Sequence, residues 1–80
     1  MKKVLIALSQ EFSSDEDEIK FEDSRGDGKH FSLQIISDSF KDLSKVARRK
    51  KVYKIINPFI NDGTIHAIQL KLKTHSENAQ

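Results

Sequence analysis

Apolar positions recur at helical spacing in two parts of the chain. The first group predicts a helix over residues 2–12 and consists of Val4, Leu5, Leu8 and Phe12. The second group is preceded by Asp42 and Ser44, either of which can cap a helix. It follows an i, i+3, i+4, i+7, i+8 stripe: Val52, Ile55, Ile56, Phe59 and Ile60. Because Pro58 has no amide hydrogen to donate, we expect this helix to kink or restart near Asn57.

Alternation of apolar and polar residues predicts three strands, near residues 18–23, 30–37 and 64–73. One face of the second strand consists of Phe31, Leu33 and Ile35, and His30 belongs to the other face. One face of the third strand consists of His66, Ile68, Leu70 and Leu72. The resulting order, α-β-β-α-β, favours an α+β domain with a three-stranded sheet and helices packed on one face.

The length and composition narrow the class of protein. Eighty residues leave room for one domain, residues 1–80, and we expect the polar residues 74–80 to form a flexible tail. The absence of Cys excludes a disulfide framework, a thiolate zinc site and a thiol nucleophile. No apolar run approaches the roughly 18–20 residues that cross a bilayer, and no signal peptide is recognisable. We therefore expect a soluble, cytoplasmic chain that is monomeric in isolation and does not bind membranes.

The motifs of common enzymes are absent. The loop Gly26–Gly28 fits neither the phosphate-binding nor the dinucleotide-binding glycine pattern, and no nucleophile elbow is present. A domain this small also lacks the volume to enclose a substrate pocket, so we do not expect an enzyme. His66, on an apolar face, fits either a hydrogen-bonded structural residue or a ligand, and His30 adjoins the glycine loop. Two histidines without Cys do not make a closed zinc site, so a partner would have to complete any metal site.

Charge is distributed unevenly along the chain. Residues 1–40 contain five basic and nine acidic side chains, whereas residues 41–80 contain nine basic and three acidic ones. Much of the positive charge falls on the second predicted helix: Lys45, Arg48, Arg49, Lys50 and Lys51. Arg48 and its neighbours are expected opposite the apolar stripe, where they form either a solvated face or a surface that neutralises the phosphates of duplex DNA. The polar sheet face has no aromatic side chains on which RNA bases could stack.

Four short motifs follow one another within residues 19–73: Gly26-Asp27-Gly28-Lys29-His30-Phe31, Ser37-Asp38-Ser39-Phe40, Val52-Tyr53 and Ile65-His66-Ala67. In this order and spacing they resemble the BolA family, and the first resembles the loop of its small bacterial branch. The resemblance implies a KH-like α+β fold with a helix-turn-helix-like element, in agreement with the predicted order of elements. The Gly-x-x-Gly backbone clamp of KH-type RNA-binding domains is missing, which argues against RNA binding of that kind.

The resemblance also implies a function for His66. In the family, the His of the matching segment ligates a two-iron, two-sulfur cluster shared with a monothiol glutaredoxin and its glutathione, which supply thiolates. The absence of Cys here is compatible with that arrangement, and mixed imidazole and thiolate ligation of such clusters is known chemistry. Better-matched subgroups place a Cys or His in the loop before the second strand. This chain has Asp27 there and His30 just beyond it, so either residue is a candidate second ligand.

Two functions follow from the resemblance. The first is a non-enzymatic adaptor that binds a monothiol glutaredoxin in iron–sulfur trafficking or iron sensing. The second, also proposed for family members, is a DNA-binding transcriptional regulator that uses the basic helix. The two can coexist, because a partner bound around His66 could mask the basic surface.

Overall fold

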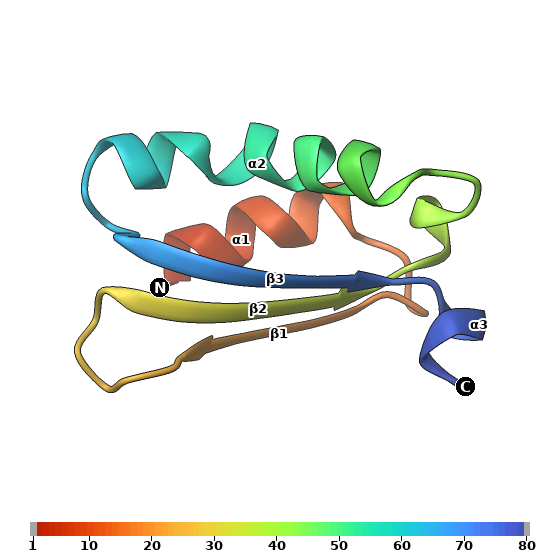
Figure 1. Cartoon of the computed structure of the whole chain (residues 1–80), viewed down its shortest axis with the longest axis horizontal. Helices are drawn as coiled ribbons and strands as arrows, with labels where there is room; N and C mark the ends of the chain where they lie inside the picture. The colour runs from red at the N-terminus through yellow and green to blue at the C-terminus, as the bar shows by residue number, and fades with distance from the viewer. Residues whose placement is uncertain (1, 80) are drawn as a thin grey trace.

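A computed structural model describes residues 2–79 and contains a three-stranded sheet with two long helices on one of its faces (Figure 1). The elements are α1 (Lys2–Glu11), β1 (Glu18–Asp23), β2 (His30–Ile36), the 3₁₀ turn η1 (Asp38–Phe40), α2 (Lys45–Asn61), β3 (Ala67–Lys73) and α3 (His75–Asn78). The predicted α+β architecture is therefore confirmed. None of the helices described within residues 2–79 is long and apolar enough to cross a membrane.

The sheet has the order β1-β2-β3 and mixes both kinds of pairing. β1 pairs with β2 in antiparallel fashion, with Phe21 opposite Leu33, as expected for strands joined by a short loop. β2 and β3 are parallel, with His30 opposite Ala67, because the chain returns through α2 between them. The parallel pairing brings the beginnings of β2 and β3 to the same end of the sheet.

The core lies between the sheet and the helices. The predicted alternation of β2 is confirmed, since Phe31, Leu33 and Ile35 are all buried. They form one cluster with buried side chains from both long helices, Val4, Leu8, Val52 and Ile56. Phe40 of η1 closes the cluster at one end, where it is fully buried and its ring centroid lies 5.3 Å from that of Phe12.

Two details of the predicted elements differ from the structure. α2 is capped by Ser44, one of the two expected caps, whose hydroxyl accepts from the Ala47 N–H. However, α2 runs through Pro58 as one helix instead of restarting there. The carbonyl that loses its partner belongs to Lys54, which is exposed, so water can satisfy it. β3 begins at Ala67 because the preceding residues turn, with the Ile65 N–H bonded to the Phe59 carbonyl at 2.9 Å.

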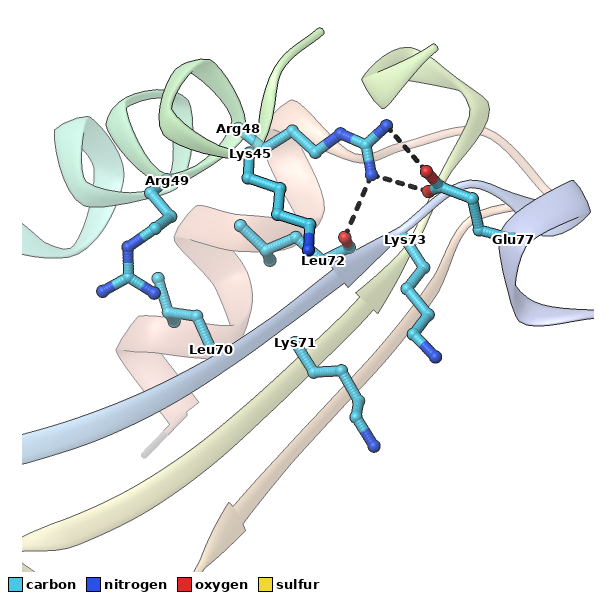
Figure 2. Close-up of a pocket in the computed structure, with 8 residues that line it drawn as sticks. All are labelled: Lys45, Arg48, Arg49, Leu70, Lys71, Leu72, Lys73 and Glu77. Atoms are coloured by element: carbon cyan, nitrogen blue, oxygen red, sulfur yellow. Dashed lines mark hydrogen bonds and ion pairs between the residues drawn. The ribbon is translucent and has the colours of Figure 1, made fainter.

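Arg48 does not lie on an exposed basic face, so that prediction was wrong. Residues at i, i+4 and i+8 share one side of a helix, and Arg48 is therefore buried on the same side as Val52 and Ile56. Its guanidinium donates to the carbonyls of Leu43 and Leu72, at 3.0 and 3.2 Å. It also forms a two-pronged ion pair with Glu77 (2.6 and 3.2 Å), drawn in Figure 2. The buried charge is thus fully partnered.

The predicted flexible tail contains an ordered helical turn. Thr74 is buried and caps α3, and Thr74 and Glu77 bond reciprocally in a capping box. Because Glu77 also pairs with Arg48, the turn is fastened to α2. The sequence could not suggest this from composition, because the two partners are 29 residues apart.

The Arg48–Glu77 pair predicts a specific loss of stability in acid. Hydrogen bonding to Arg48 is the main reason why the pKa of Glu77 falls from 4.5 to about 2 in the folded chain. Below about pH 5 the unfolded chain binds this proton more readily than the folded chain does, so stability falls until about pH 2. We expect Glu77→Gln to flatten the dependence of the melting temperature on pH over this range. Glu16→Gln, which changes an exposed carboxylate that pairs with no basic side chain among residues 2–79, should leave the dependence unchanged, and equal curves for both variants would contradict the assignment.

Candidate functional site

Two histidines meet at the end of the sheet where β2 and β3 begin. The Lys29 carbonyl accepts hydrogen bonds from the N–H groups of His66 and Ala67, at 3.0 and 3.1 Å, which fixes the start of β3 beside the start of β2. As a result the rings of His30 and His66 lie edge to face, with centroids 5.5 Å apart. Residues 36 positions apart in the sequence are thus neighbours in the fold.

Asp27 orients the first histidine. Its Oδ2 lies 2.7 Å from His30 Nδ1, and its Oδ1 accepts from the backbone N–H groups of Lys29 and His30. These bonds, with the Lys29 N–H as the largest contribution, lower the pKa of Asp27 from 3.8 to about 2. Asp27 is therefore ionised at neutral pH with both oxygens engaged. Since Nδ1 of His30 is occupied, Nε2 is the ring nitrogen that remains for another ligand.

The loop before β2 holds Asp27 in this place. Gly28 has φ near +71°, a conformation that side chains disfavour, and its N–H donates to Asp23 Oδ2 at 2.7 Å. The loop thus turns back toward the sheet, and the carboxylate of Asp27 caps the start of β2.

His66 is exposed and precedes β3, so it does not belong to the apolar strand face on which a hydrogen-bonded structural role was one interpretation. Its side chain makes no hydrogen bond to another residue within the described range. His30 lies off the Phe31 face, as alternation predicted, yet it reaches His66. The signal that could have predicted this contact was the strand–helix–strand connection, which implies parallel strands that begin at the same end of the sheet.

The pair does not form a complete metal site by itself. Within residues 2–79 no group of three or more His, Asp or Glu side chains is arranged to hold a metal ion. The chain offers two adjacent imidazoles, one of them oriented by a carboxylate, at an exposed edge. Further donors would have to come from another molecule.

The predicted basic surface is smaller than the sequence suggested. Arg48 is buried, and Lys51 is partly buried with its Nζ 3.9 Å from Glu11. Lys45, Arg49 and Lys50 are exposed, although the Arg49 guanidinium lies over the Tyr53 ring. Three of the five predicted phosphate contacts therefore remain accessible to a polyanion.

Comparison with known proteins identifies the family to which this chain belongs. The sequence profile of the family described as BolA-like protein matches residues 3–77, and the chain belongs to this family. It is 39% identical over 54 residues to the DNA-binding transcriptional regulator BolA of Haemophilus influenzae, a match covering 68% of this chain and 52% of the relative. It is 34% identical over 55 residues to acid stress protein IbaG of Escherichia coli, covering 69% and 66%.

The fold agrees with solved structures of the same family. BolA1 from Arabidopsis thaliana superposes with a TM-score of 0.83 and 28% sequence identity, covering 95% of this chain and 92% of that one. The sequence match spans only about half the length of the Haemophilus relative, whereas the structural match extends over nearly the whole domain. The predicted family resemblance is confirmed.

Proposed function

We propose that this chain is a non-enzymatic adaptor that binds a monothiol glutaredoxin and contributes imidazole ligands to a two-iron, two-sulfur cluster shared with it. The observation that supports the proposal is the contact between His30 and His66 at an exposed end of the sheet. A pair of imidazoles at a surface, with His30 held by Asp27 only through Nδ1, suits a metal centre that is completed across an interface.

The donor set fits such a cluster. Imidazole nitrogen is a good ligand for iron, whereas a carboxylate oxygen is a poor match beside sulfide and thiolate. Asp27 already has both oxygens engaged with His30 and the loop backbone. We therefore assign the ligand role to His66 and His30, and assign Asp27 to positioning His30, in the manner of carboxylates behind metal-bound histidines. The glutaredoxin and glutathione would supply the thiolates that this chain lacks.

The test is anaerobic reconstitution of this chain with a monothiol glutaredoxin, glutathione, iron and sulfide. We expect a complex of both proteins whose visible absorption and circular dichroism differ from those of the glutaredoxin reconstituted alone. Because only neutral imidazole coordinates metal, the difference should fade as the pH is lowered. Failure of the two proteins to co-purify, or a spectrum identical to that of the glutaredoxin alone, would contradict the proposal.

Binding to duplex DNA is a second candidate. It is favoured by Lys50 and Lys54, two exposed side chains one helical turn apart on α2, and by the name of the Haemophilus relative. We expect weak binding that declines with added salt and is lost in the double variant Lys50→Glu/Lys54→Glu. Binding by this variant equal to that of the unchanged chain would exclude the helix as the contact surface.

A further inference from the structure

β3 presents a backbone edge to which another strand could be added. It is an outer strand of the sheet, and its inner edge is fixed by bonds such as that from Ser37 N–H to the Lys73 carbonyl (2.9 Å). In a parallel pair, successive residues direct their backbone groups to opposite edges. Ile68, Leu70 and Leu72 therefore direct theirs outward. The Leu72 carbonyl accepts a hydrogen bond from the Arg48 side chain, which agrees with this outward direction. The outward N–H and C=O of Leu70 have no partner from a neighbouring strand among residues 2–79.

This edge borders a groove of about 370 Å³ between the first half of α2 and β3 (Figure 2). Leu70 and Leu72 point into it toward α2 and remain partly exposed, so they form an apolar floor. Lys71 and Lys73 alternate with them and point to the opposite face of the sheet. An added strand would thus meet apolar side chains on one of its faces and ammonium groups on the other.

The charge at this groove is positive. Arg48 and Glu77 neutralise each other at one end of it. The other basic residues that line it have no carboxylate within ion-pair distance among residues 2–79: Lys45, Arg49, Lys71 and Lys73. A segment that pairs with this edge would therefore be favoured if it carried carboxylates.

We propose that the β3 edge binds an extended acidic segment of another protein, which adds to the sheet as a fourth strand. Its backbone would bond to the outward groups of Leu70 and its neighbours, and its alternating carboxylates would face Lys71 and Lys73. A peptide uses the free backbone groups and the apolar floor, neither of which a duplex phosphate backbone would occupy. The apolar floor at Leu70 and Leu72 lies about 13–20 Å along the strand from His66, so its side chains are separate from the histidine pair.

The experiment is a titration of the isotope-labelled chain, followed by nuclear magnetic resonance, with a short peptide in which Glu alternates with Val. We expect the amide signals of Ile68, Leu70 and Leu72 to shift and their exchange with solvent to slow, because they gain acceptors. A matched peptide with Lys in place of Glu should cause no change. Shifts without slowed exchange at Leu70 would overturn strand addition.

Variants separate this surface from the rest of the basic helix. Lys71→Glu/Lys73→Glu should weaken binding of the acidic peptide at least about tenfold. The charge-matched control Lys50→Glu/Lys54→Glu should bind it nearly as well as the unchanged chain. Equal weakening by both variants would reduce the effect to net charge and overturn the proposal. So would edge protection that appears with duplex DNA but not with the peptide, or with rising chain concentration alone.

Discussion

Phe40→Ala is expected to destabilise the chain by about 3–5 kcal/mol, because removing a fully buried ring leaves a cavity that the surroundings fill only in part. Phe40 contacts the Phe12 ring, and the Arg48 guanidinium lies 5.8 Å from its centroid. Its loss therefore affects the core and the packing around the buried ion pair together. A domain of this size has a total stability of about 4–12 kcal/mol, so the variant should be partly unfolded near physiological temperature.

Urea denaturation followed by circular dichroism measures this effect. Phe59→Ala provides a matched control, since the same ring is removed from a position that is only partly buried. We expect it to cost about half as much or less. A larger loss for Phe59→Ala than for Phe40→Ala would show that the core lies nearer to the C-terminal half of α2 than the structure indicates.

His66→Ala is expected to abolish the cluster spectrum of the glutaredoxin complex while leaving the fold intact. The side chain is exposed and makes no hydrogen bond within the described residues, so its removal should change stability by less than about 0.5 kcal/mol. This combination separates a ligand from a structural histidine, whose loss would lower the melting temperature.

Three further variants make the result specific to the site. His30→Ala should also alter the spectrum, and Asp27→Ala should weaken the signal without abolishing it, because it frees the His30 ring to rotate. His75→Ala removes a histidine at the other end of β3 and should leave the spectrum unchanged. A normal spectrum from folded His66→Ala would exclude His66 as a ligand.

Local sequence patterns predicted the elements and most of their faces. Alternation placed Phe31, Leu33 and Ile35 in the core, and the bounds of β1 and β2 were within one residue of those observed. These predictions held because burial on one face imposes a period on nearby residues. The pairing of β2 with β3 is a property of topology instead. Because local patterns do not give this pairing, they could not predict the contact between His30 and His66.

Arg48 shows the limit of reading charge from sequence alone. Its place in a basic run suggested exposure, although its spacing from Val52 and Ile56 put it on the buried side of α2. Burial is tolerable only because two carbonyls and Glu77 satisfy the guanidinium, and those partners come from distant segments. The helical spacing of Arg48 from the apolar residues therefore predicted its burial better than the charge of its sequence neighbours did.

The most direct test of imidazole ligation is pulsed electron paramagnetic resonance of the reduced complex. The chain would carry histidine labelled with nitrogen-15, and the glutaredoxin and glutathione would be unlabelled. We predict strong hyperfine coupling to nitrogen-15, because a nitrogen bonded to iron shares its unpaired spin. The coupling pattern should lose one nitrogen in the His30→Ala variant, which removes one of the two proposed imidazole ligands. A cluster assembled with both proteins that shows no nitrogen-15 coupling would contradict the assignment of His66 and His30 as its ligands.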